Sequence, residues 1–199
     1  AFIPETVLSL SSEGEFRILL SCFINLANPQ DDQISALIHS ATQLGGYLSH
    51  IDFTDKGWVA YVMFGAPLGY EKMAQRAMDF AGTAQTLFGK NARLGLTQGK
   101  AFTGFIGSQS RAEYTGMGMA VNLAARFMTK AGWGDVWFDE SIRTELASTI
   151  TAENLGELEF KGYPTAITTY RNLNKMQNKA EVSFRSGFVG RGLFRLFFL

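Results

Sequence analysis

Residues 104–128 read GFIGSQSRAEYTGMGMAVNLAARFM, and this stretch contributes most to the fold prediction. It begins as a glycine-punctuated strand, passes through a polar loop and ends in a predicted helix over residues 120–131. Asn122 and Arg126 are four residues apart on that helix, so they project from one face. The positions predicted to cover the opposite face are small or apolar: Val121, Ala124, Ala125 and Met128. A guanidinium and an amide on one helical face are typical of a polyphosphate cradle, but the same spacing also occurs in ordinary surface pairs.

Hydrophobic patterning on either side of this stretch predicts an α+β fold. Strands are expected over residues 16–26, 47–53, 58–64, 135–138, 158–160 and 166–170, and residues 92–107 are expected to form two strands joined near residues 98–100. Helices are expected over residues 34–44, 71–88, 120–131 and 140–146. The order β-α-β-β-α-β is that of a ferredoxin-like core, extended here by a helix and further strands.

Composition limits the kinds of partner. The chain has 199 residues with 18 basic and 18 acidic side chains, so no net charge favours nucleic acid or an anionic membrane. No apolar run approaches the ~20 residues of a membrane span, and the first residues lack the pattern of a signal peptide. The single cysteine, Cys22, can form neither an internal disulfide nor a cysteine-rich zinc site. These features favour a cytoplasmic protein.

The apolar rhythm is lost after residue 173. We therefore expect one domain over residues 1–173, and a linker with the start of a following module over residues 174–199. The sequence FVGR at residues 188–191 resembles the opening of a P-loop ATPase module, although no phosphate-binding G-x4-G-K-[ST] loop is present.

The stretch RAEYTGMGMAVNLAAR resembles the signature of class III adenylyl and guanylyl cyclases, near R-x-E-Y-T-V-x-G-D-x-V-N-x-A-x-R. The resemblance covers roughly residues 15–172. The phrases CFINL, TDKGW…VMFGAP and EYTGMGMAVNLAARFM are similar to the second, metal-free cyclase domain of soluble bicarbonate-sensitive adenylyl cyclases and their bacterial cyclase–ATPase relatives. Enzymes of this family bind ATP between two domains, one of which supplies two aspartates that hold Mg²⁺ or Mn²⁺.

The resemblance implies a role for five positions. Asn122 matches the residue that orients the ribose, and Arg126 the residue that stabilises charge on the α-phosphate. Thr115 falls where adenylyl cyclases read the adenine edge, and His50 aligns with their adenine-selecting lysine. Lys161, in the sequence FKG, matches a lysine that reaches the distal phosphates.

Two departures concern the metal. Asn25 and Trp58 stand where the family has its metal-binding aspartates. An amide carries no charge to offset a divalent cation, and an indole cannot ligate Mg²⁺. Asp52 and Asp55 flank the predicted hairpin and are candidate substitute ligands, but a solvated turn is the simpler interpretation. The metal ions are therefore expected from a partner domain.

Three functional hypotheses remain open. In the first, the chain is half of an adenylate cyclase site that converts ATP to cyclic AMP and pyrophosphate. The expected partner is a metal-bearing cyclase domain of the same polypeptide, or a second copy of the chain in a weak homodimer. Alternatively the chain is an inactive pseudo-cyclase with a regulatory, nucleotide-binding or dimerisation role, or a plain interaction module. A diguanylate cyclase is disfavoured because no G-G-[DE]-E-F stretch occurs. Neither nucleic acid nor a membrane is expected as a partner.

Overall fold

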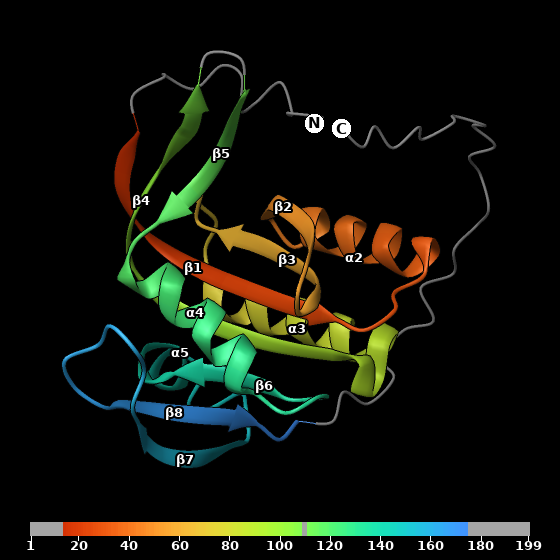
Figure 1. Ribbon diagram of the computed structural model, residues 1–199. Coiled ribbons are helices and arrows are strands. Elements are labelled where there is room, and N and C mark those ends of the chain that lie inside the picture. Colours follow the sequence, from red (N-terminus) through yellow and green to blue (C-terminus); the bar gives the residue numbers. More distant parts are fainter. Residues whose placement is uncertain (1–13, 109–110, 175–199) are drawn as a thin grey trace.

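A computed structural model describes residues 14–108 and 111–174 of the chain (Figure 1). Seven of its strands form a continuous sheet in the order β2-β3-β1-β4-β6-β8-β7, and β5 pairs with β4 off this path. The strands span β1 Glu15–Leu26, β2 Gly46–Thr54, β3 Gly57–Phe64, β4 Ala92–Ser108, β5 Arg111–Met117, β6 Val136–Asp139, β7 Ala152–Leu158 and β8 Ile167–Asn172. The helices span α2 Asp31–Gln43, α3 Met73–Phe88, α4 Met119–Lys130 and α5 Glu140–Glu145, with a 3-10 turn at Gly89–Asn91.

The segment from β1 to β4 follows the predicted β-α-β-β-α-β order, so the ferredoxin-like core is confirmed. Alternation along β1 separates two packing faces. Leu20, Cys22 and Ile24 belong to the main core with buried residues of α2 and α3, whereas Leu19 joins a second cluster on the other face. Burial raises the pKa of the Cys22 thiol, as expected of a core cysteine. In Figure 1, α4 crosses the face opposite α3.

The prediction of two strands within residues 92–107 is wrong, because β4 is a single strand of 17 residues. Its glycines serve close packing with α4. A β-carbon at Gly95 would lie 2.1 Å from the carbonyl oxygen of Ala124, and one at Gly99 would lie 2.8 Å from the β-carbon of Ala120. The following stretch, expected as a polar loop, contains β5, which pairs with the far half of β4.

The second strand of the final hairpin lies close to where it was predicted, but the first strand lies earlier in the chain. The hairpin pairs β7 with β8, whereas Phe160, expected in a strand, lies in the connecting loop and packs on Phe127 of α4. The polar sequence of β7, AENLGEL, gave little strand signal because backbone pairing with β8 rather than burial defines it. Residues 1–13 and 175–199, which include the predicted linker and following module, lie outside the described residues. Among the described helices, none is long and apolar enough to cross a membrane.

Candidate active site

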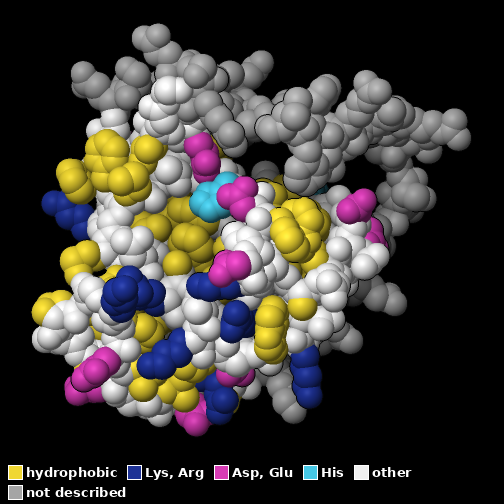
Figure 2. All heavy atoms as spheres, viewed as in Figure 1, with side chains coloured by type: hydrophobic (Ala, Val, Ile, Leu, Met, Phe, Trp, Pro, Cys, Tyr) yellow, Lys and Arg dark blue, Asp and Glu magenta, His cyan; other side chains and the backbone are white. Residues whose placement is uncertain are grey.

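The sheet face that carries α4 brings together residues from β1, β2, β3, β4, β5, α4 and the β7–β8 loop. Of the predicted positions, Trp58 has its side chain on the opposite face, against the main core. Figure 2 views the molecule from this side and shows an imidazole beside acidic groups, a hydrophobic area next to it, and Lys and Arg side chains gathered below. The site has three corners, which we name the base corner (Ser49, His50, Glu113 and Thr115), the phosphate corner (Asn122, Arg126 and Lys161) and the metal corner (Asn25, Trp58 and Arg93).

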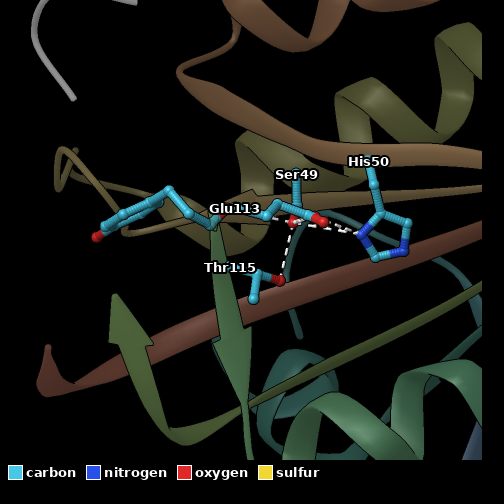
Figure 3. A network of polar contacts seen from close by, with 5 residues as sticks. Ser49, His50, Glu113 and Thr115 are labelled. Carbon is cyan, nitrogen blue, oxygen red and sulfur yellow. Dashed lines mark hydrogen bonds and ion pairs between the residues drawn. The ribbon is translucent and has the colours of Figure 1, made fainter. Parts of the chain in front are cut away.

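The base corner joins two of the predicted site residues through two that were not predicted (Figure 3). His50 Nδ1 lies 2.9 Å from Glu113 Oε1, and the Ser49 hydroxyl lies 2.8 Å from the same carboxylate oxygen. Ser49 Oγ is also 2.8 Å from Thr115 Oγ1. The register of β2 against β3 shifts between Leu48 and His50, so Ser49 is an extra residue on β2. This bulge allows the neighbouring Ser49 and His50 side chains to reach the same carboxylate.

Aromatic rings underlie the base corner. Phe23 and Tyr61 stack with their ring centroids 4.4 Å apart and their planes at 8°. The His50 ring approaches Tyr61 edge-on, with centroids 5.7 Å apart. Tyr61 is held in place by a 3.1 Å hydrogen bond with Ser21, and burial raises the pKa of its phenol. Such a rigid apolar floor beside polar groups is suited to a planar heterocycle.

In the phosphate corner, α4 positions two predicted residues one turn apart. Asn122 is exposed, and Arg126 is half-buried with an Nε atom that is buried and has no hydrogen-bond partner. Lys161 is exposed on the loop that crosses α4. A β-carbon at Gly162 would lie 3.8 Å from Arg126 Nη2, so this loop runs directly past the guanidinium. The geometry therefore brings the predicted cationic groups Arg126 and Lys161 into one neighbourhood.

Tyr163 fastens this loop to the start of α4. Its hydroxyl donates to the carbonyl oxygen of Met119. Burial raises the pKa of the Tyr163 phenol, while the nearby positive charge of Arg126 acts in the opposite direction. Thr97 of β4 fixes the same end of α4 by a 2.6 Å hydrogen bond to the carbonyl oxygen of Ala120. Together these contacts fix the position from which Asn122 and Arg126 project.

The metal corner is closed by contacts within the protein. Asn25 is fully buried, and its Nδ2 donates to the carbonyl oxygens of Lys56 at 2.8 Å and Trp58 at 3.0 Å. Its Oδ1 accepts a 2.9 Å hydrogen bond from Arg93 Nε. Arg93 also donates to the carbonyl oxygens of Thr129 and Ala131 at the end of α4. Its guanidinium lies 4.7 Å from the Trp133 ring centroid, and burial lowers its pKa.

These residues do not fit a divalent cation. The only oxygen of the Asn25 side chain already accepts from a permanent cation, and a second positive charge beside Arg93 would be repelled. The Trp58 side chain packs against the main core beneath α2 and α3. Asp52 and Asp55 are exposed, and the described part of the chain contains no cluster of three or more His, Cys, Asp or Glu side chains able to hold a metal ion.

Sequence reasoning missed Ser49, Glu113, Arg93 and Tyr163. Glu113 carried a signal, because it stands two residues before Thr115 within the quoted signature. The bulge at Ser49 and the β1–β4 register that places Arg93 opposite Asn25 are long-range features without a local sequence pattern. Tyr163 depends on the path of a loop, which is equally hard to read from periodicity.

Comparison with known proteins identifies the family of the chain. Residues 30–174 match the family described as "Adenylate and Guanylate cyclase catalytic domain", well over half of the 199-residue chain, and the chain therefore belongs to that family. No curated protein sequence matches the chain significantly.

Solved structures of cyclase domains share the fold at low sequence identity. The adenylyl cyclase CyaB from P. aeruginosa is 18% identical with a TM-score of 0.70, covering 84% of this chain and 100% of that one. The catalytic core of a rhodopsin-guanylyl cyclase with converted specificity, in complex with ATPalphaS, is 18% identical with a TM-score of 0.68, covering 81% and 98%. A dimeric guanylyl cyclase domain of the RhoGC fusion protein from Blastocladiella emersonii is 18% identical with a TM-score of 0.64, covering 80% and 98%.

Proposed function

We propose that this domain is one half of an adenylate cyclase site and supplies nucleotide-binding and transition-state residues to a partner domain that binds the metal ions. The observation that carries the proposal is the contrast between two corners of the site. Arg126 has a buried Nε without a partner beside exposed Asn122 and Lys161, whereas the polar atoms of Asn25 are all engaged within the protein. A buried guanidinium nitrogen without an acceptor is costly unless a ligand supplies one.

In the proposed reaction the 3′-hydroxyl oxygen of ATP attacks the α-phosphorus. The bond from the α-phosphorus to the oxygen leading to the β-phosphate breaks, pyrophosphate leaves with that oxygen, and the proton of the 3′-hydroxyl is released to solvent. Negative charge on the α-phosphate oxygens is then stabilised by Arg126, whose charge and fork geometry suit phosphate oxygens. Asn122 orients the ribose, and Lys161 holds the distal phosphates as a point charge.

The base would lie in the base corner. The half-buried Phe23 ring, stacked on the buried Tyr61 ring, offers an apolar surface, and His50 and Thr115 offer polar atoms near it. In this proposal base recognition and charge stabilisation both belong to this domain, as the family resemblance implies.

The metal ions, Mg²⁺ or Mn²⁺, belong to the partner domain in this proposal, because the metal corner of this domain is occupied by Arg93. Exposed apolar side chains fit a domain that is completed by another one. Met117 and Met119, which stand between the base corner and α4, are 52% and 58% exposed. A second cyclase domain of the same polypeptide is the proposed partner, and a weak homodimer is its substitute for the isolated chain.

One observation favours a second candidate, a regulatory pseudo-cyclase. Arg93 hydrogen-bonds both Asn25 and the end of α4, so contacts within the protein stabilise the metal corner without a metal ion. Such a domain would bind a nucleotide and control its neighbour without chemistry of its own.

The two candidates are separated by measuring cyclic AMP and pyrophosphate formation by the full-length protein with ATP and Mg²⁺. The half-site proposal predicts that Asn122→Ala greatly lowers turnover while the matched control Asn154→Ala, an exposed asparagine on β7, leaves it unchanged. Turnover that is unaffected by Asn122→Ala would support the pseudo-cyclase instead.

A further inference from the structure

A pocket of about 660 Å³ lies where α3 and β8 end and where the chain passes from α4 to β6. Its walls come from the last turn of α3, the 3-10 turn at Gly89–Asn91, the loop between α4 and β6, and the end of β8 with the residues that follow it. We name it the Trp133 pocket, after the aromatic residue that lines it. Its lining residues are separate from those of the base, phosphate and metal corners, and its volume is typical of sites for small organic molecules.

Contacts between distant segments fix the walls of the Trp133 pocket. Gln85 Nε2 of α3 donates a 2.8 Å hydrogen bond to the carbonyl oxygen of Gly134, and the Gly134 N–H donates at 2.7 Å to the carbonyl oxygen of Ala92. A β-carbon at Gly134 would lie 3.7 Å from both Cα and Cγ of Lys90, so the stem of this lysine lies against the glycine. The pocket is therefore already formed without a ligand.

The pocket has a flat apolar surface. Trp133 is 44% exposed and Leu173 is 48% exposed, and both line the pocket. The guanidinium of Arg93 lies over the Trp133 ring, 4.7 Å from its centroid, and holds the indole in place. An indole that is fixed by a cation and still open over nearly half its surface suits stacking with a flat ring.

Two asparagine amides that line the pocket have their orientation fixed by the backbone. Asn172 Oδ1 accepts a 3.1 Å hydrogen bond from the N–H of Asn174, and Asn174 Oδ1 accepts one at 3.0 Å from the N–H of Thr151. A backbone N–H only donates, so both amide oxygens are identified and the groups left to a ligand are the amide N–H donors. Neither amide nitrogen donates to another group in the described part of the chain.

The charges around the pocket favour an anion. Asp135, the carboxylate among the lining residues, lies 3.6 Å from Arg171, which also pairs with Glu153. Lys90 is exposed, and its ammonium forms no ion pair within residues 14–108 and 111–174. The lysine therefore leaves a positive charge at the pocket that the described acidic side chains do not offset, next to amides that donate.

From these groups we infer that the Trp133 pocket is an effector site for a small, flat organic anion, whose ring stacks on Trp133 and whose charged group meets Lys90 and the asparagine amides. Donors, one free cation and an indole surface are what such a ligand requires.

The word effector follows from the second role of Arg93. The guanidinium that holds Trp133 also donates to the carbonyl oxygens of Thr129 and Ala131, at the end of the helix that carries Asn122 and Arg126. A ring stacked on Trp133 restrains this end of α4 and should tighten nucleotide binding at its other residues. Binding of the anion is independent of the proposed function, whereas its effect on the nucleotide rests on it.

The test is isothermal titration calorimetry of the full-length protein with naphthoate, a flat anion. Naphthamide has the same rings without the charge, and acetate has the charge without the rings. The titrations are repeated with saturating 3′-deoxy-ATP, which cannot cyclise because it lacks the attacking hydroxyl. The wild type should bind naphthamide about fivefold more weakly than naphthoate, the size of an exposed ion pair, and should bind acetate not at all. Weaker naphthoate binding with the nucleotide present would place the compound in the nucleotide site and overturn the inference.

Two substitutions locate the compound. Lys90→Gln should weaken naphthoate about fivefold and leave naphthamide unchanged, because it removes only the charge. Trp133→Leu should weaken both compounds about tenfold, because it removes the flat ring. Lys72→Gln is the matched control, an exposed lysine at the opposite end of α3, and it should behave as the wild type. Naphthoate binding that is absent in the wild type, or equal in Lys90→Gln and Trp133→Leu to that of the wild type, would overturn the inference.

The effector role is measured as the affinity for 3′-deoxy-ATP with and without saturating naphthoate. Naphthoate should tighten nucleotide binding about twofold or more in the wild type and in Lys72→Gln. Nucleotide affinity that ignores bound naphthoate would reject the effector role. A parallel cyclic AMP assay separates this result from the proposed function. Tightened nucleotide binding without cyclic AMP formation would sustain the effector site and reject the half-site, and cyclic AMP formation without any effect of naphthoate would do the reverse.

Discussion

Asn25 and Arg93 of the metal corner lie on the α4 side of the sheet, as the phosphate corner does, but the two corners differ in how their polar groups are bonded. In the metal corner Asn25 and Arg93 bond to each other and to four backbone carbonyl oxygens. In the phosphate corner the side chains of Asn122 and Lys161 make no hydrogen bond to another described residue, and Arg126 Nε is buried without an acceptor. The comparison shows that a polar group saturated within the protein stabilises the fold, whereas one left open is available to a ligand.

The largest effect on activity is expected from a substitution in the phosphate corner. Arg126→Ala in the full-length protein should lower kcat by about 10²–10³, the size found when one preorganised donor to a transition-state oxyanion is removed. The KM for ATP should change much less, because Lys161 and the metal ions of the partner still hold the distal phosphates. Steady-state kinetics measures both quantities.

The control for Arg126 is Arg76→Ala, which removes an arginine that stacks on Tyr70 away from the site. It should leave kcat unchanged. The melting temperature of Arg126→Ala should also be close to that of the wild type. A large drop in melting temperature would instead show that Arg126 has a structural role.

A substitution in the metal corner should instead lower the stability of the protein. Arg93→Ala removes the donor to Asn25 Oδ1 and to two carbonyl oxygens at the end of α4, so unfolding should become easier by about 2–4 kcal/mol. Chemical denaturation of the isolated chain measures this change. A stability equal to wild type would show that the contacts of Arg93 are replaced by water at no cost.

Asn25→Asp tests the same corner for metal binding. The new carboxylate would pair with the guanidinium of Arg93, whose positive charge repels a divalent cation, so the substitution should not create a metal site. Mn²⁺ should leave the melting temperature of this variant unchanged. A melting temperature that rises with Mn²⁺ would contradict the account of this corner.

A buried carboxylate away from both corners, Asp139, should make the free energy of unfolding depend on pH. Burial raises the pKa of Asp139 from 3.8 to about 6, although it accepts hydrogen bonds from the backbone amides of Gln98 and Ile142. A raised folded-state pKa means that the folded protein binds this proton more tightly than the unfolded chain. The stabilisation is fully present below about pH 4 and is lost as the pH rises through about 6.

The measurement is the free energy of unfolding at pH 4 to 7 for the wild type and Asp139→Asn. The wild type should lose on the order of 2 kcal/mol relative to the variant over this range. A constant difference between the two proteins would show that Asp139 titrates normally.

The smallest effect is expected at the edge of the phosphate corner. Tyr163→Phe removes the hydrogen bond to the Met119 carbonyl oxygen, which should cost about 1 kcal/mol of stability. Because this bond fixes the loop against α4 beside Arg126, kcat should fall severalfold while the KM for ATP stays constant. An equal fall in Tyr170→Phe, whose hydroxyl bonds to Glu140, would show that the kinetic effect is not specific to this loop.

Much of the fold followed from local pattern, and the errors have a common cause. The strands of the hairpin, the helix carrying Asn122 and the ferredoxin-like order were predicted from periodicity. The break expected in β4 was wrong because Gly95 and Gly99 admit α4 rather than make a turn. The contacts of Ser49 in the base corner depend on a bulge, and the Asn25–Arg93 contact depends on strand register. Both arise from pairing between distant segments.

The central claim is that this domain carries the transition-state residues and lacks a metal site, so it cannot catalyse the reaction alone. The most direct measurement is cyclic AMP formation by the purified, partner-free chain with ATP and either Mg²⁺ or Mn²⁺. The account predicts no product above background with either ion, including at protein concentrations at which the chain pairs with itself. Robust cyclic AMP formation by the chain alone would contradict it and would direct attention to Asp52 and Asp55 as metal ligands.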